Sequence, residues 1–98
     1  RFLPNPHYQS TLRRKTGLDE PVQNYILAQP IARRFLNDWH EIITTLLPHY
    51  VREGKSYLTI AIGCTGGRHR SVFCTRWLAQ KLQSSGHPVQ EFHRDISL

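Results

Sequence analysis

The chain of 98 residues contains no methionine and only two cysteines, Cys64 and Cys74. The cysteines lie ten positions apart, and no C-x-x-C pair or Cys/His ligand pattern is present, which argues against a disulfide scaffold and a structural zinc site. No apolar run approaches the roughly 18 residues that a membrane span needs, and no signal-peptide pattern is present. We therefore expect a domain with no metal and no membrane contact, in a reducing, cytoplasmic setting.

Acidic residues are also scarce. Seven Asp and Glu face thirteen Lys and Arg, so the net charge is +6 with neutral histidines. A basic small domain favours polyanionic partners, which include nucleic acid, phosphorylated metabolites and an acidic protein face. Arg13, Arg14 and Lys15 form the densest basic run, and with Arg94 they are the candidate RNA-binding residues. Charge alone does not distinguish these classes of partner.

The pattern of prolines, glycines and apolar residues predicts one α/β domain over residues 1–98. Residues 1–4 have the composition of a strand end, and we interpret the chain as a piece of a longer protein whose first strand is truncated. Residues 7–18 lack periodicity and predict an exposed loop. A short helix is expected between Asp19 and Pro30. A longer one, with an apolar stripe, is expected from Pro30 to Gly54, with a kink or an end at its internal proline.

The second half of the chain predicts a βαβ unit. Residues 56–62 form an apolar, partly β-branched run that is typical of a buried central strand. A helix is expected from Ser71 to about Ser84, with Cys74 in the core, and residues 89–93 predict a last strand. The crossover between the two strands should be right-handed. We therefore expect a small sheet with helices packed on it.

The loop between the predicted central strand and the next helix has the composition of an anion site. Its glycines let backbone N–H groups approach an anion closely, and a helix N-terminus adds partial positive charge. Arg68 and Arg70 supply full charges, and Thr65 and Ser71 supply hydroxyl groups. Two arginines at a helix start oppose the helix dipole, which indicates that a bound anion offsets them.

The order of the predicted strands adds further basic groups to this crevice. If the first and last strands run parallel to the central one, His7 and the pair His93-Arg94 end on the same side of the sheet. Three separate segments would then face one ligand. A tight Gly-Gly connection with no ligand remains the alternative interpretation of the loop.

Two catalytic motifs can be tested against the loop. The Walker pattern GxxxxGK[ST] is absent, so a P-loop nucleotide site is not supported. The segment from Cys64 to Ser71 does match C-x5-R-S, the signature of cysteine-dependent phosphatases, in which Arg70 would bind the phosphate and the helix start would lower the thiol pKa. No aspartate is clearly placed as the general acid, and we therefore expect no catalytic residue. A phosphatase stays the alternative.

Four stretches together resemble a known family: RFLPNPHY, LRRKTGLDEPVQNYIL, IAIGCTGGRHRSV and a closing segment that ends in HRD. In order and spacing they look like the C-terminal domain of the RNase adapter protein RapZ. Full-length relatives also have an N-terminal P-loop domain that binds ATP or GTP, so the resemblance implies no nucleotide cofactor for this segment. It implies a non-enzymatic, oligomeric domain that binds glucosamine 6-phosphate and small regulatory RNA and presents the RNA to an endoribonuclease.

The motif match also assigns residues to the sugar phosphate. With the groups already selected for their charge or hydroxyl, the predicted ligand site comprises His7, Thr65, Gly66, Gly67, Arg68, His69, Arg70 and Ser71. The sequence departs from the family at its end, HRDISL, which offers no lysine-arginine tail for RNA.

Overall fold

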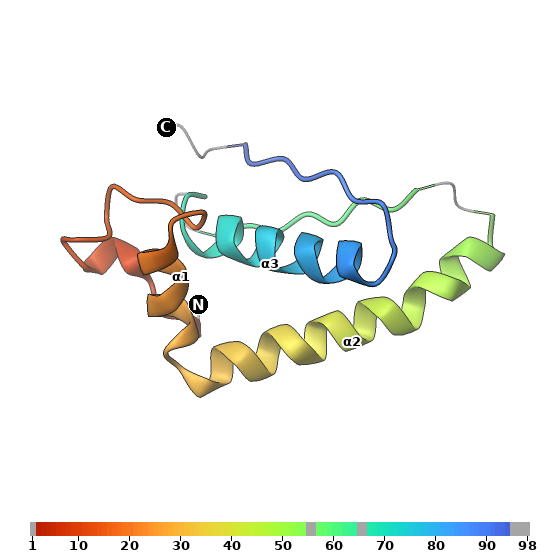
Figure 1. The fold of residues 1–98 in the computed structure, drawn as a ribbon, viewed down its shortest axis with the longest axis horizontal. Helices are drawn as coiled ribbons and strands as arrows, with labels where there is room; N and C mark the ends of the chain where they lie inside the picture. Colours follow the sequence, from red (N-terminus) through yellow and green to blue (C-terminus); the bar gives the residue numbers. More distant parts are fainter. Residues whose placement is uncertain (1, 55–56, 65–66, 95–98) are drawn as a thin grey trace.

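The computed structural model describes residues 2–54, 57–64 and 67–94. Its elements are a 3-10 turn and three α-helices: η1 (Pro6–Tyr8), α1 (Glu20–Leu27), α2 (Pro30–Arg52) and α3 (Arg70–Ser84). α3 packs on α2, and α1 contacts η1, α2 and α3. Figure 1 shows α3 between α2 and two extended segments, residues 57–64 and 87–94, which follow its opposite side.

The predicted α/β fold is wrong. Within the three described ranges there is no strand and no sheet, so the βαβ unit is absent and the helices pack on one another instead. The described parts of the three predicted strands, residues 2–4, 57–62 and 89–93, are present as chain without strand pairing. The sequence pattern identified segments that can extend, but an extended segment becomes a strand only when a neighbour pairs with its backbone.

The two extended segments, residues 57–64 and 87–94, are too exposed to form a buried sheet. Parallel strands are stable when both faces of the sheet are covered. Here α3 covers one side, while Tyr57 and Phe92 are 85% and 82% exposed and Leu58 and Ile60 are 40% and 37% exposed. Residues 57–62, the described part of the predicted central strand, therefore do not form the buried strand that their apolar composition predicted.

The predicted helices are all present, because their signals are local. α2 begins at Pro30, a residue suited to the first helical turn, and continues through Pro48 to Arg52 rather than ending there. Gly54 follows with φ +83°, a left-handed conformation that favours glycine and stops the helix. None of the helices in the described part of the chain combines the length and the apolar character needed to cross a membrane.

A small core joins the three helices and the N-terminal segment. Val22 and Ile26 of α1 and Leu36 of α2 are fully buried, and Phe73 and Cys74 of α3 pack against them. Cys74 thus has the core position that its place on the apolar stripe predicted.

Residues 7–18 are not simply the exposed loop that their lack of periodicity suggested. Leu12 and Gly17 are buried, and the Gly17 N–H donates a hydrogen bond to the Arg68 carbonyl at 2.9 Å. A Cβ atom on Gly17 would overlap the His69 carbonyl oxygen and the Phe73 nitrogen. The N-terminal segment therefore lies directly against the start of α3.

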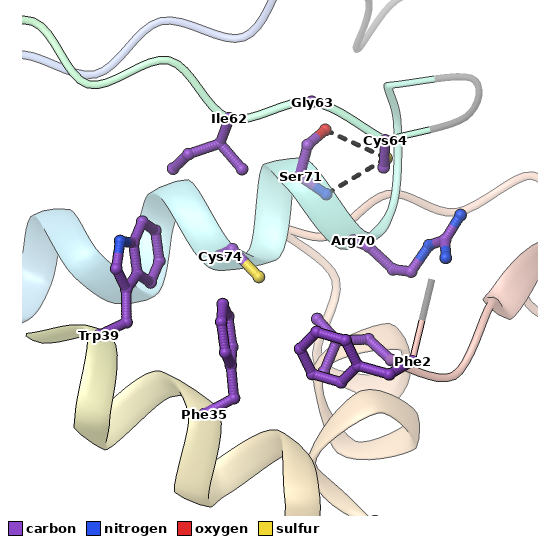
Figure 2. Close-up of a pocket in the computed structure, with 10 residues that line it drawn as sticks. Phe2, Phe35, Trp39, Ile62, Gly63, Cys64, Arg70, Ser71 and Cys74 are labelled. Carbon is purple, nitrogen blue, oxygen red and sulfur yellow. Dashed lines mark hydrogen bonds between the residues drawn. The ribbon is translucent and has the colours of Figure 1, made fainter.

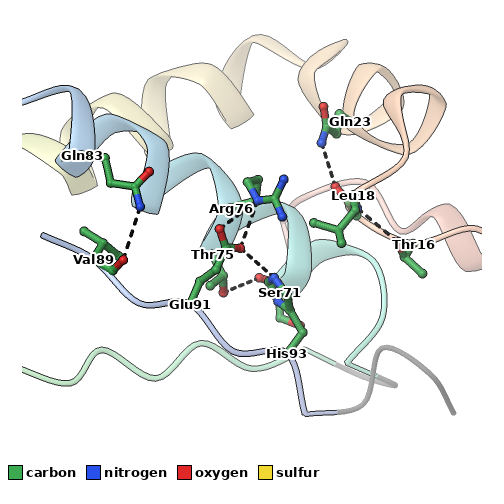
Figure 3. A network of polar contacts seen from close by, with 11 residues as sticks. Thr16, Leu18, Gln23, Ser71, Thr75, Arg76, Gln83, Val89, Glu91 and His93 are labelled. Atoms are coloured by element: carbon green, nitrogen blue, oxygen red, sulfur yellow. Dashed lines mark hydrogen bonds and ion pairs between the residues drawn. The ribbon is translucent and has the colours of Figure 1, made fainter.

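An ion pair attaches the last segment to α3. The Arg76 Nε–H donates to both carboxylate oxygens of Glu91, at 2.9 and 3.0 Å, and the His93 Nε2 lies 2.8 Å from Glu91 Oε2 (Figure 3). The side chain of His93 is only 12% exposed and that of Glu91 is 23% exposed. These contacts hold residues 87–94 along α3 in the absence of strand pairing.

Candidate anion-binding site

In the described part of the chain, the start of α3 is basic and has no side-chain cap. Arg70 is the first helical residue, the N-cap His69 makes no side-chain capping hydrogen bond, and the first turn contains no acidic residue. The N-terminal N–H groups of a helix point outward without intrahelical partners and carry about half a positive charge. This helix end therefore favours an anion.

The basic side chains at this end are largely withdrawn from solvent. His69 and Arg70 are 7% and 8% exposed. Within the described ranges, no hydrogen bond or ion pair involves the Arg70 guanidinium, and the buried His69 Nε2 and Arg68 Nε atoms have no hydrogen-bond partner. A buried charge without a counter-charge is costly. An anion bound here would offset that cost.

Cys64 lies across from the first turn of α3 and contacts Ser71 twice (Figure 2). The Ser71 N–H donates to the Cys64 sulfur at 3.3 Å, and the Ser71 hydroxyl and the sulfur form a second hydrogen bond at 3.3 Å. These contacts fix the point at which the extended segment turns into the loop, one residue after Gly63.

The two thiols differ in acidity. Burial alone would raise the pKa of Cys64, but hydrogen bonds from the Ser71 side chain and from the backbone of Ser71 and Gly67, with the charge of Arg70, lower it below its ordinary value. Burial raises the pKa of Cys74 to about 11, and the neighbouring Cys64 adds to that increase. Cys64 is therefore the thiol that ionises more readily.

A cavity of about 340 Å³ opens beside the helix start. Arg70, Ser71 and Cys64 line one part of it, and aromatic side chains line another. The lining comes from four places: the N-terminal segment, α2, the extended segment and the first two turns of α3 (Figure 2). The full lining is Phe2, Leu3, Phe35, Trp39, Ile62, Gly63, Cys64, Arg70, Ser71 and Cys74.

The structure places five of the eight predicted ligand residues together at the start of α3: Gly67, Arg68, His69, Arg70 and Ser71. Gly67 has φ +67°, a left-handed conformation that favours glycine at this position. Thr65 and Gly66 lie outside the described residues. His7, the eighth, is exposed on η1, and within the described ranges its imidazole makes no hydrogen bond to the loop.

We expected parallel strand ends to bring His7, His93 and Arg94 to the loop. No sheet forms in the described ranges, so this arrangement does not position the basic groups. His93 lies on Glu91, in the contact with Arg76, and its imidazole is committed there. The N-terminal segment reaches the loop by its backbone instead, since the Arg68 Nη2 donates to the Arg14 carbonyl at 3.0 Å. The Arg13 Nε–H donates to the His7 carbonyl at 2.9 Å, which links η1 to the same segment.

The candidate RNA-binding residues fall into two groups. Arg13, Arg14 and Lys15 have exposed side chains on the segment that contacts Arg68. Arg94 is exposed near the end of the last segment and has an interaction partner. The basic run and the candidate anion site therefore adjoin one another.

Sequence analysis missed two contributors. Gly17 supports the helix start, and a glycine inside an aperiodic stretch was the available signal for a close backbone approach. Phe35 and Trp39 belong to the apolar stripe predicted for the long helix, but nothing in the helical spacing indicated that their rings would line a cavity rather than fill the core.

Comparison with known proteins agrees with the resemblance. Residues 1–97 match the family model described as the RapZ C-terminal domain. The chain is 53% identical over 97 residues to a nucleotide-binding protein of Shewanella woodyi, covering 99% of this chain and 35% of the relative. A nucleotide-binding protein of Desulforudis audaxviator is 49% identical over 96 residues, which cover 98% of this chain and 33% of that protein. The chain thus spans about a third of the length of the curated relatives it matches. It belongs to the RapZ C-terminal domain family.

Proposed function

We propose that this domain is a non-enzymatic sensor that binds the phosphate group of a small metabolite at the start of α3. The metabolite class is an amino-sugar phosphate such as glucosamine 6-phosphate, as the family resemblance implies. The proposed ligand residues are the predicted ones: His7, Thr65, Gly66, Gly67, Arg68, His69, Arg70 and Ser71. The relatives' name, nucleotide-binding protein, refers to chains about three times as long, and this segment has no Walker motif, so we assign it no nucleotide.

One observation supports the proposal most strongly. Arg70 is 8% exposed, lies at an uncapped helix start with no acidic residue in the first turn, and has no counter-charge within the described ranges. A phosphate would satisfy the guanidinium and the remaining N–H groups of the first turn, beside the Ser71 N–H and hydroxyl that contact the Cys64 sulfur. An apolar ligand or a cation would satisfy none of them.

Calorimetric titration with three compounds tests this function. Glucosamine 6-phosphate and inorganic phosphate should bind, whereas glucosamine, which lacks the phosphate, should give no measurable heat of binding. Increasing salt should weaken both phosphate ligands only modestly, because dissolved ions screen a largely buried charge pair less than an exposed one. Binding of glucosamine as tight as that of its phosphate would contradict the proposal, and so would the failure of both phosphates.

The cysteine phosphatase keeps one specific observation in its favour, the paired Ser71 contacts that lower the pKa of Cys64. Among the described residues, however, no aspartate is placed as a general acid. Asp19 accepts a hydrogen bond from the Thr16 N–H at 2.7 Å beside α1, and Asp38 lies on the exposed side of α2 next to Arg34. Neither aspartate lines the cavity that contains Cys64. We therefore retain the binding function.

An aryl phosphatase substrate separates the two functions. The domain should show no turnover above background, and Cys64→Ser should bind phosphate about as well as the natural chain. Turnover that disappears with this single substitution would establish the phosphatase instead.

We further propose that the domain binds small regulatory RNA through Arg13, Arg14, Lys15 and Arg94 and acts as an adapter to an endoribonuclease, as a cytoplasmic homo-oligomer. The net charge of +6 and the exposed basic run beside Arg68 support this proposal. The adapter role itself derives from the family to which the chain belongs.

A further inference from the structure

The cavity beside the helix start has two unlike walls. Arg70, Ser71 and Cys64 form a polar wall, whereas Phe2, Phe35 and Trp39 form an aromatic one (Figure 2). Of the predicted sugar-phosphate residues that the structure describes, Arg70 and Ser71 line it, whereas His7, Gly67, Arg68 and His69 do not.

The aromatic wall is a continuous row of rings. Phe2 meets Phe35 edge to face with centroids 4.9 Å apart, and Phe35 stacks on Trp39 at 5.9 Å with an interplanar angle of 18°. Phe2 and Phe35 remain 54% and 36% exposed. Adjacent exposed aromatic rings at a concave site are typical of ligand-binding surfaces.

The polar wall presents the anion-binding end of the same cavity. Arg70 is more than nine-tenths buried without a counter-charge in the described ranges, and Figure 2 shows it beyond the Phe2 end of the aromatic row. A volume of about 340 Å³ suits a small one-ring ligand rather than a single ion, since ligand pockets start at roughly 300 Å³.

We propose that this cavity binds phosphate monoesters whose organic group is an apolar ring, with the phosphate at Arg70 and Ser71 and the ring against Phe35 and Trp39. The proposal rests on the proposed function for its phosphate end. It goes further in the ligand class, because an apolar ring would cover more of the aromatic wall than a sugar ring with hydroxyl groups does. An aromatic ring would remove both its own surface and the wall's surface from water.

Phenyl phosphate and methyl phosphate provide the matched probes, because they share the monoester group and differ only in the apolar body. Calorimetry on the natural chain should find phenyl phosphate about tenfold tighter, a difference of about 1.4 kcal/mol. Phe35→Ala should abolish the preference and leave methyl phosphate within about twofold. Ile31→Ala, one turn earlier on α2 and outside the cavity lining, should change neither affinity.

A second variant guards against a folding defect at Phe35. Phe2 lies outside the helices, so Phe2→Ala should reduce the phenyl preference without unfolding α2. Equal affinities for phenyl and methyl phosphate in the natural chain would overturn this inference while leaving the proposed function standing. A phenyl preference that survives both Phe35→Ala and Phe2→Ala would also overturn it. If neither monoester nor inorganic phosphate binds, the proposed function and this inference both fail.

Discussion

At the scale of single residues, the packing at the start of α3 depends on a glycine, which has no functional side chain. Gly17 lies where a methyl group would overlap the backbone of His69 and Phe73, so its role is to let two backbones approach. Gly17→Ala should therefore destabilise the fold by roughly 2 to 4 kcal/mol, the range of severe overpacking. Thermal unfolding followed by circular dichroism measures this change.

Gly63→Ala is the matched control, because among the described residues no atom beyond the two chain neighbours lies within 4 Å of a Cβ built there. It should change the unfolding free energy by less than about 0.5 kcal/mol, as surface substitutions usually do. Equal stability of the two variants would show that the N-terminal segment does not pack on α3 as described.

The two cysteines should differ in reactivity. Burial alone would raise the pKa of Cys64, but its hydrogen bonds with Ser71 outweigh this effect and lower the pKa. Burial raises the pKa of Cys74 to about 11. Because the thiolate is the nucleophile, iodoacetamide near neutral pH should modify Cys64 first. Peptide mass spectrometry identifies the modified residue.

Ser71→Ala provides the test of the cause. It removes the hydroxyl but keeps the N–H donor, so the pH midpoint of Cys64 alkylation should move upward, towards that of an ordinary thiol. An unchanged midpoint, or preferential modification of Cys74, would contradict the described contacts.

At the scale of elements, the attachment of the last segment to α3 should depend on pH. Burial would raise the pKa of Glu91, but hydrogen bonds and charges from Arg76 and His93 lower it overall. A carboxyl whose pKa is lowered by folding stabilises the fold above its ordinary pKa, and this stabilisation is lost as the pH falls through the lowered value. The contact should therefore be intact at neutral pH and absent in strong acid.

Glu91→Gln measures that contribution. At pH 7 it should cost about 1 kcal/mol, because the Arg76 partner is partly exposed and screened, and the cost should vanish in strong acid. Asp38→Asn is the control, since the Arg34–Asp38 pair is 3.8 Å long and highly exposed and should contribute almost nothing. A constant difference between the natural chain and Glu91→Gln from pH 7 to acid would contradict an ionised Glu91.

Comparison of the elements shows which sequence signals are sufficient. Pro30 and the apolar stripe that follows it define α2 because helix hydrogen bonds join near neighbours. The run at residues 57–62 is equally apolar, yet a sheet requires partners far along the chain and cover on both faces, which no short window of sequence contains. The helices could therefore be predicted from the sequence, whereas the arrangement of the extended segments could not.

At the scale of the whole molecule, one part of the candidate anion site could be predicted from the sequence and another part could not. Arg68, Arg70 and Ser71 were identified from a glycine loop before a helix, and the structure groups them at the start of α3. The contact of Arg68 with the Arg14 carbonyl joins residues 54 positions apart, so nothing local indicated it. The same contact brings the basic run next to the proposed phosphate site.

Substitution of Arg13, Arg14 and Lys15 together by alanine tests RNA binding by this surface. RNA affinity should fall, and its salt dependence should flatten by two to three contacts' worth, at roughly 0.7 to 0.9 log units per contact. Phosphate affinity should stay within about twofold, because alanine at position 14 keeps the carbonyl that Arg68 contacts. Fluorescence anisotropy with a structured RNA at several salt concentrations measures the RNA affinity and its salt dependence.

An unchanged salt slope in this triple variant would place the RNA surface elsewhere. No binding by the natural chain at moderate salt would show that this domain alone is not the RNA-binding unit.

The most direct test of the central claim is calorimetric titration of glucosamine 6-phosphate against the natural chain and two arginine variants. Arg70→Ala removes the buried charge at the helix start and should weaken binding roughly 10- to 150-fold, the equivalent of about 1.5 to 3 kcal/mol for a charge-assisted contact. Arg34→Ala removes an arginine with an 85% exposed side chain on α2 and should leave the affinity unchanged. If Arg70→Ala binds as tightly as Arg34→Ala, Arg70 does not bind the phosphate and the account of this site is wrong.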